Sequence, residues 1–325
     1  MEKILKTVSK MSQPSRNLFD NFFRHSRKSP QRERRLVTNQ FGKYELIEPW
    51  KIIHPFRTIP ASIAKPCYYK SQSQDIPPQI VEIKNENQIE CMRHSCRLAK
   101  KILNHTKEII KPGITTDYLD EQLHDLIINH GAYPSPLYYH GFPKSICTSI
   151  NNVACHGIPD DRPLIEGDSL NVDVSVYLNG FHGDCSGMFA IGKLDEDMKK
   201  LITVTQTCLD AAIDICRPNE RFCSIGYVIE KIAKENGFSV IPYFAGHGIG
   251  TYFHGLPDIF HFVNDEFGKM QPGMTFTIEP VLTQGDTEIE VLEDGWTAVT
   301  VDSARTAQIE HTILITETGC DILTC

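Results

Sequence analysis

Four carboxylates and one imidazole stand in short apolar stretches of the second half of the chain. Asp173 lies in Leu-Asn-Val-Asp-Val and Glu279 in Phe-Thr-Ile-Glu-Pro, and the set is completed by Asp184, His247 and Glu310. Oxygen and imidazole ligands suit a pair of Mn, Fe, Co or Zn ions, whereas a structural zinc site would use cysteines. A charge left unpaired in an apolar strand costs on the order of 3 to 5 kcal/mol, and a bound cation removes that penalty. The five residues therefore predict a site for two divalent metal ions.

Two of these acids are predicted to lie on the two arms of one β-hairpin. Asp173 and Asp184 flank Asn179-Gly180, a dipeptide that favours a type I′ turn, and the runs on either side are rich in strand-forming residues. Residues on the same face of a hairpin come close together, so both acids could reach one metal ion.

Apolar side chains recur with helical or strand spacing along the rest of the chain from about residue 80. Thr116 is predicted as the N-cap of the second helix, and Gly131 and Gly237 supply C-terminal stops. Helices are predicted at 86–110, 116–131, 196–216 and through Ile225, Ile229 and Ile232, and strands at 146–153, 170–177, 181–191 and 309–315.

The chain repeats itself at two nearly equal spacings. A shift of about 106 positions places Pro112 on Pro218, Gly131 on Gly237 and Asp173 on Glu279, and a shift of about 98 places His156-Gly-Ile-Pro-Asp on His254-Gly-Leu-Pro-Asp. Groups at equivalent places can converge on one site only if the two halves pack face to face. We therefore expect one domain with a pseudo-twofold axis, and because the turn is repeated we assign His156 and His254 polar roles beside the site.

Charge is distributed unevenly along the chain. Residues 1–40 hold ten basic and three acidic residues, which leaves 23 basic and 38 acidic residues in the remainder. The acidic remainder argues against nucleic-acid binding, and no run approaches the roughly 20 apolar residues of a membrane span. The basic, Ser- and Phe-containing start is typical of a mitochondrial presequence, which indicates the matrix. A charged tail on a cytoplasmic protein is the alternative. Residues 41–79 are predicted to be an extended arm or linker.

At these motifs the sequence closely resembles methionine aminopeptidase of type 1, a member of the pita-bread metallopeptidase family. The resemblance runs from about residue 80 to 325. It is carried by Lys144-Ser-Ile-Cys-Thr-Ser-Ile-Asn151, His156-Gly-Ile-Pro, Asp173-Val-Ser, His182-Gly-Asp184, Gly246-His-Gly-Ile-Gly250, Phe253-His254, Phe276-Thr-Ile-Glu-Pro280 and Gln308-Ile-Glu-His311. It implies an α+β pita-bread fold, in which a pseudo-twofold, curved antiparallel sheet is covered by outer helices and holds a central dimetal site.

The resemblance also implies a role for each candidate ligand. Asp173 would bind one metal ion, His247 and Glu279 the other, and Asp184 and Glu310 both. A water molecule activated by the two ions would attack the first peptide bond of the substrate, and Glu279 would move its proton.

The same resemblance extends to the residues that handle the substrate. His254 would contact the scissile amide and His156 would assist on the leaving-group side, so that His156, His254 and Glu279 form the catalytic set. A pocket for the methionine thioether would be lined by Tyr139, Phe142, Cys147, Phe253 and Trp296.

Three positions depart from the usual family pattern. Pro136 stands where many members have a pocket cysteine, Ser175 stands for a threonine, and Cys185 replaces the residue expected after His-Gly-Asp. Pro136 and the basic start make the chain most similar to the mitochondrial form.

The implied activity is removal of the N-terminal methionine from nascent or newly imported proteins with a small second residue. The substrate would be a peptide or nascent-protein N-terminus. A monomer is expected, and the resemblance is compatible with ribosome association. The alternatives are an Xaa-Pro aminopeptidase or prolidase of the same fold and a non-catalytic pita-bread binding module. A prolidase normally has a large N-terminal domain, for which the residues before Ile80 are too few, and binding modules lose ligands that are all present here. A mononuclear iron oxygenase needs two histidines and one carboxylate, which fits this set poorly.

Overall fold

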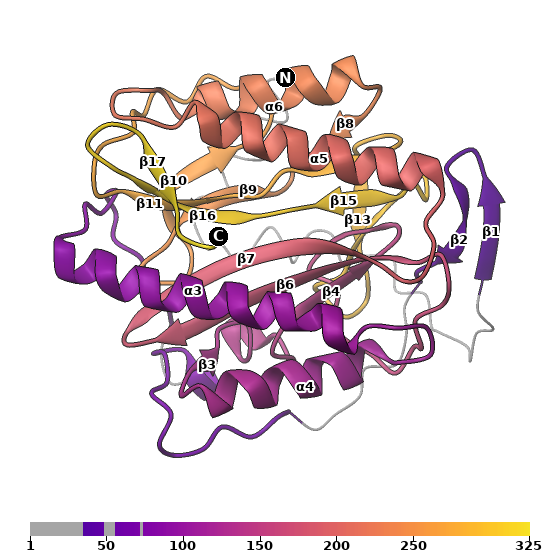
Figure 1. Cartoon of the computed structure of the whole chain (residues 1–325), viewed down its shortest axis with the longest axis horizontal. Coiled ribbons are helices and arrows are strands. Elements are labelled where there is room, and N and C mark those ends of the chain that lie inside the picture. Colours follow the sequence, from indigo (N-terminus) through magenta and orange to yellow (C-terminus); the bar gives the residue numbers. More distant parts are fainter. Residues whose placement is uncertain (1–34, 49–55, 72–73) are drawn as a thin grey trace.

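The computed structural model describes residues 35–48, 56–71 and 74–325 (Figure 1). Residues 1–34 of the predicted presequence lie outside the described residues. No helix in the described ranges is both long enough and apolar enough to cross a membrane.

The first pair of helices confirms the predicted helical segments. Helix α3 spans Glu86–Ile109, and Asn85 begins it with a capping box in which its side chain accepts from the Gln88 amide. Helix α4 spans Thr116–Asn129. Its N-cap is Thr115, whose hydroxyl accepts from the Tyr118 amide, so the prediction of Thr116 was wrong by one residue. Thr116 instead hydrogen-bonds Asp160, a long-range contact with no local sequence signal.

The strands of the first half form a small antiparallel sheet around one long hairpin. Strand β6 pairs with β7, and β3 and β4 lie along the other edge of β6. The turn residues Asn179 and Gly180 both have positive φ, as the predicted type I′ turn requires. The predicted strand at 146–153 is split in two, because Asn151 takes a left-handed conformation and its side chain bonds the Ser169 amide. The strands are β3 (Tyr133–Pro134), β4 (Cys147–Ile150), β5 (Val153–Cys155), β6 (Ser169–Leu178) and β7 (Phe181–Ala190).

The second half repeats this plan. Helix α5 spans Glu196–Asp214 and is capped by Asp195, and helix α6 spans Cys223–Glu235. The central strands again run in the order β9-β11-β16. The strands are β8 (Ser239–Val240), β9 (Ala245–Gly248), β10 (Gly255–Phe260), β11 (Thr275–Ile278), β12 (Val281–Thr283), β13 (Ile289–Val291), β14 (Ala298–Thr300), β15 (Thr306–Gln308), β16 (His311–Ile315) and β17 (Cys320–Ile322).

The two halves correspond strand by strand. The order β4-β6-β7 matches β9-β11-β16, so Asp173 on β6 corresponds to Glu279 after β11, and Asp184 on β7 to Glu310 before β16. The halves meet where the Glu310 amide donates to the Ser186 carbonyl at 3.3 Å. In Figure 1 the helix pairs α3/α4 and α5/α6 lie on the outside, with the strands between them. Each pair covers its own apolar core, so the carboxylates lie on the inner side, where the halves face each other.

The close packing of α3 on β7 depends on a residue without a side chain. A Cβ added at Gly183 would lie 2.5 Å from the backbone nitrogen of Cys96 and the backbone carbon of Ser95. We expect Gly183→Ala to lower the free energy of unfolding by about 1 to 3 kcal/mol, because the helix backbone must shift. Gly187→Ala on the same face of β7 is the matched control, since its Cβ would make only ordinary contacts, with Leu103 at 3.6 Å and Phe189 at 3.9 Å. Equal urea midpoints for the two variants would contradict this account of the packing.

The segment that precedes the helices also packs on the domain. Strands β1 (Arg35–Asn39) and β2 (Gly42–Leu46) form a hairpin in which Tyr44 is buried beneath the Arg305 guanidinium, 5.3 Å from the ring centroid. The proposed boundary at residue 40 falls inside this hairpin. Farther along, Tyr68 is buried next to Tyr133 and Leu137. The division into presequence, arm and domain stays a proposal, but the described part of the arm lies against the domain.

Candidate active site

Asp173 and Asp184 come together because of the register of their hairpin. Ser175 pairs with Asp184 and Asp173 pairs with Ser186, so the two acids lie diagonally on one face of the β6–β7 ladder. Beyond the effect of burial, the two carboxyl groups are close enough for the charge of Asp184 to raise the pKa of Asp173. This is the proximity that the sequence predicts for the two acids.

The second half brings three further ligand candidates to the same place. His247 lies on β9 between two glycines whose added Cβ atoms would meet the Thr277 carbonyl oxygen at 2.2 Å and the Leu256 carbonyl oxygen at 1.9 Å. Small neighbours therefore let β9 lie close to the strands on both sides. Glu279 follows β11 directly, and Glu310 lies between β15 and β16.

The five side chains converge on one place, where four of them are buried and Asp173 is half-buried. Ligand atoms of Asp184, His247 and Glu310 all lie within 4.8 Å of one another. His247 Nε2 is 3.8 Å from Asp184 Oδ2 and 3.7 Å from Glu279 Oε1. Oδ1 of Asp173 is buried and has no hydrogen-bond partner among the described residues. Four carboxylates and an imidazole that converge in this way fit divalent metal ions, because no Lys or Arg side chain among the described residues forms an ion pair with these acids.

Neighbouring hydroxyl and amide groups orient the carboxylates. Ser175 Oγ donates to Asp184 Oδ1 at 2.7 Å, and Thr277 Oγ1 donates to Glu279 Oε1 at 2.8 Å. Gln308 Nε2 lies 3.2 Å from the other Glu279 oxygen. Sequence reasoning missed Thr277 and Gln308. Each lies two residues before a ligand candidate, and side chains two residues apart on a strand point to the same face of the sheet. This spacing was the sequence signal for a residue that orients a ligand.

Burial and mutual repulsion disturb the titration of the whole cluster. Burial, followed by the charges of Asp184 and Glu279, raises the pKa of Asp173 well above its usual value, and burial does the same for Glu310. Burial raises the pKa of Glu279 to about 8, while the Thr277 hydroxyl opposes the shift. Burial lowers the pKa of His247 to about 4, so its imidazole is neutral at pH 7. A neutral imidazole is the form that binds a metal ion.

Chelation should leave a protein that becomes less stable as the pH rises from 7 to 8. With the pKa of Glu279 raised to about 8, the folded metal-free protein binds more protons than the unfolded chain, in which such carboxyls titrate near pH 4. Through this carboxyl the free energy of unfolding falls with rising pH. The buried histidines act in the opposite sense near pH 7, but they do so in the metal-loaded protein as well, so the difference between the two forms reports the carboxyls. We expect Tm of chelator-treated protein to fall across this window more steeply than Tm of the Mn²⁺-loaded protein. Equal slopes of Tm against pH for the chelator-treated and the Mn²⁺-loaded protein would contradict this expectation.

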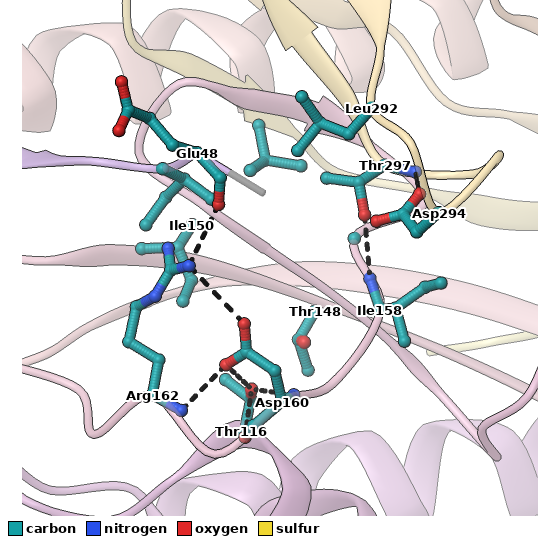
Figure 2. Close-up of a pocket in the computed structure, with 13 residues that line it drawn as sticks. Glu48, Thr116, Thr148, Ile150, Ile158, Asp160, Arg162, Leu292, Asp294 and Thr297 are labelled. Carbon is teal, nitrogen blue, oxygen red and sulfur yellow. Dashed lines mark hydrogen bonds and ion pairs between the residues drawn. The ribbon is translucent and has the colours of Figure 1, made fainter. Parts of the chain in front are cut away.

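His156 is held in place by the turn that follows it, whose residues Ile158 and Asp160 line a small hollow (Figure 2). Its backbone has a φ of +56°, an unfavourable conformation for a residue with a side chain. The Ile158 amide donates to Thr297 Oγ1 at 3.3 Å, and Asp160 accepts from the Arg162 amide at 2.9 Å. These bonds fix the turn, and burial lowers the pKa of His156 to about 4.

Asp294, which lines the same hollow, holds the Trp296 side of the predicted methionine pocket in position. Asp294 accepts the backbone amides of Trp296 and Thr297, both at 2.8 Å, and Figure 2 shows it beside Thr297. The Trp296 ring meets Phe142 edge to face at 5.2 Å and His156 at 6.1 Å between centroids. Cys147 packs in the same small cluster, and it pairs with Asp173 across β4 and β6. This part of the pocket therefore adjoins a ligand candidate.

The remaining predicted pocket residues gather around His254. Its ring lies 4.0 Å from that of His247, 4.2 Å from Phe253 and 5.0 Å from Tyr139, between centroids. Burial and the nearby histidines lower the pKa of His254 well below its usual value. His182, which belongs to the His182-Gly-Asp184 motif, is fully buried and stacks on Phe253 with the ring centroids 5.0 Å apart. All the predicted site residues therefore lie in this central cluster or on its aromatic border.

The fold and the buried ligand cluster agree with a comparison of the sequence with known families. Residues 90–317 match the model of metallopeptidase family M24, and the chain belongs to this family. The predicted α+β pita-bread fold is thereby confirmed, with structural support from solved relatives. Methionine aminopeptidase from Rickettsia prowazekii is 41% identical, with a TM-score of 0.74 over 76% of this chain and 100% of that one.

Curated relatives narrow the likeness within the family. The chain is 51% identical over 273 residues to methionine aminopeptidase 1D, mitochondrial, of Danio rerio, a match that covers 84% of this chain and 81% of the relative. It is 50% identical to the human protein of the same name, over 83% of this chain and 80% of that protein. A prolidase from Pyrococcus furiosus shares the fold with a TM-score of 0.60, at 21% identity over 75% of this chain and 65% of that one. That likeness concerns the fold alone.

Proposed function

We propose that this protein is a methionyl aminopeptidase that removes the N-terminal methionine from peptides and proteins with a small second residue. The observation that carries the proposal is the position of the aromatic pocket. Phe253 and His254 lie beside the ligand His247, and Cys147 lies beside the ligand Asp173. An apolar, sulfur-compatible pocket next to a metal cluster suits a substrate whose first side chain is a thioether and whose first peptide bond is to be cut. The names of the curated relatives support the same substrate.

Two divalent metal ions, of Co, Mn, Fe or Zn, would be held by the five clustered residues. Asp173 would serve one ion and His247 and Glu279 the other, while Asp184 and Glu310 would serve both. When bound, the ions supply Lewis acidity and a water nucleophile at neutral pH. The hydroxyls of Ser175 and Thr277 orient the carboxylates of Asp184 and Glu279, which would hold the ions.

The protein's own side chains complete the chemistry. Glu279 takes up the proton of the attacking water and returns it to the departing amine. His254 is neutral and half-buried, and its N–H group donates a hydrogen bond to the oxygen on which negative charge develops. His156 is likewise neutral and contacts the substrate on the leaving-group side. Tyr139, Phe142, Cys147, Phe253 and Trp296 enclose the methionine side chain and exclude water.

A direct test is the release of methionine from defined peptides by the metal-loaded full chain, measured by mass spectrometry. We expect cleavage of Met-Ala-Ser and little cleavage of Met-Leu-Ser or Ala-Pro-Ser. Cleavage of Ala-Pro-Ser without cleavage of Met-Ala-Ser would replace the proposal with an Xaa-Pro peptidase. Binding of Met-Ala-Ser without release by the metal-loaded protein would indicate a non-catalytic binding module.

We place this activity in the mitochondrial matrix, where it would act on newly made or newly imported proteins. The basic start of the sequence and the mitochondrial names of its relatives support this location. Mass spectrometry of the N-terminus of protein purified from its source would show whether the first 40 or so residues are removed. Retention of Met1 would favour the cytoplasm. A monomeric state and ribosome association stay predictions from the resemblance.

A further inference from the structure

Part of the N-terminal arm lies against the aromatic pocket. Tyr68 is 4% exposed, and its hydroxyl donates to the Ser135 carbonyl at 2.7 Å. Its ring meets Tyr139 edge to face at 5.0 Å and stacks over His182 at 6.1 Å, between centroids. Tyr139 in turn touches Phe253 and His254. The arm therefore packs on the outer side of the rings assigned to the substrate.

A second contact reaches the backbone of the pocket itself. Asp75 Oδ2 accepts the Phe253 amide at 2.8 Å. Phe253 lies between β9, which ends at Gly248, and β10, which begins at Gly255, so strand pairing does not fix its position. Pro77 packs near Gly255, where an added Cβ would lie 2.9 Å from the proline Cβ. Asp75 and Pro77 thus meet the chain at both ends of the Phe253-His254 pair.

We propose that Asp75 is a positioning residue for the methionine pocket. Three residues of the arm, Tyr68, Asp75 and Pro77, are called the arm contacts below, and through them the arm forms an outer wall of this pocket. The inference rests on the proposed function. The arm contacts precede residue 90, where the match to the family model begins. Residues outside the matched range therefore shape the site within it.

The physical argument starts from a buried amide. Phe253 is 4% exposed, so its N–H group needs a protein partner, and a buried donor left without a partner is destabilising. The cost can be relieved by a shift of the Phe253 backbone, which would move the ring against the methionine side chain and carry His254 with it. Burial also raises the pKa of Asp75, and a protonated or amide side chain can still accept through its carbonyl oxygen. The acceptor oxygen is therefore what matters, and asparagine should replace aspartate.

The test compares Asp75→Ala with Asp75→Asn in the metal-loaded full chain. We expect Asp75→Ala to lower kcat/KM for Met-Ala-Ser by about tenfold, mainly through a higher KM, which corresponds to about 1.4 kcal/mol. The preference for Met-Ala-Ser over the same peptide with norleucine at the first position should change too. Asp75→Asn should stay within about twofold of the parent protein. Metal content should be unchanged in both, because Asp75 touches no ligand candidate.

Ile76→Ala is the matched control, since Ile76 follows Asp75 and is 77% exposed. It should leave kcat/KM unchanged. If Asp75→Ala fails to fold, Tyr68→Phe serves instead: it keeps the ring stack, removes the bond to Ser135 and should raise KM about threefold. Parental kinetics in Asp75→Ala, or in Tyr68→Phe when that variant is used, would overturn the inference. Equal impairment of Asp75→Asn and Asp75→Ala would overturn it as well. A parent protein that cannot release methionine would instead overturn the proposed function.

Discussion

Replacement of Asp173 by asparagine is expected to reduce kcat for Met-Ala-Ser by more than about 100-fold and to release one metal ion. Loss of a group that merely orients a ligand typically costs 10- to 100-fold, so loss of a ligand charge should cost more. The Asp173 carboxyl lies diagonally beside Asp184 on the β6–β7 ladder and has one buried oxygen without a partner among the described residues. An amide of the same shape removes the negative charge with little change in packing. Elemental analysis of dialysed protein should then find about one ion per chain.

Asp286→Asn is the control for this substitution. Asp286 is an exposed acid outside the cluster, so kcat and metal content should match those of the parent protein. Full activity of Asp173→Asn with two ions bound would remove Asp173 from the ligand set. Loss of both ions with loss of the folded state would mean that the carboxylate serves the fold, which a thermal melt of the metal-free variant would reveal.

Replacement of His254 by alanine is expected to lower kcat by about 10² to 10³, with KM and metal content little changed. This is the typical cost of removing one hydrogen-bond donor to a developing oxyanion. The pKa of His254 is lowered by burial and by neighbouring histidines, so the ring is neutral at pH 7 and donates through its one N–H group. Its Nδ1 is buried without a partner among the described residues, which leaves the ring free to turn towards a substrate.

The His254 ring lies 4.0 Å from that of His247, so His254 could also act indirectly, by supporting this ligand candidate. A measurement of metal content distinguishes hydrogen-bond donation to the substrate from this indirect role. If His254→Ala loses metal as well as activity, then His254 acts by supporting His247. His94→Ala on the exposed side of α3 is the control and should keep both. An unchanged kcat would exclude His254 from the reaction.

Sequence reasoning located most of the fold and of the candidate site because both depend on local patterns. The apolar spacing of α3 and the Asn179-Gly180 turn act within a few residues of themselves, and the structure confirms them. The ligands were recognisable because an acid flanked by Val or Ile on a strand is costly unless a cation is near. The repeat added the one long-range fact, that Asp173 and Glu279 occupy equivalent places.

What the sequence did not indicate depends on distant partners. Thr115 rather than Thr116 caps α4, because the Thr116 hydroxyl is engaged by Asp160 more than 40 residues away. The strand predicted at 146–153 is interrupted at Asn151, because the Asn151 side chain accepts a hydrogen bond from the Ser169 amide. The arm offers no periodic signal, so its contact from Asp75 to Phe253 appears only in three dimensions.

The strand correspondence between the halves has a consequence for how the metal ions bind. In the two halves Asp173 corresponds to Glu279, and Asp184 corresponds to Glu310. The shift of 98 residues that superimposes β4 on β9 makes Ser149 the residue equivalent to His247. A serine hydroxyl is a much weaker ligand than an imidazole, so the near-symmetry of the acids is broken at this one position. Under the proposed occupancy, the two ions sit in inequivalent coordination spheres and differ in affinity. Metal loading is then sequential, and one ion is retained at concentrations at which the other exchanges with solvent.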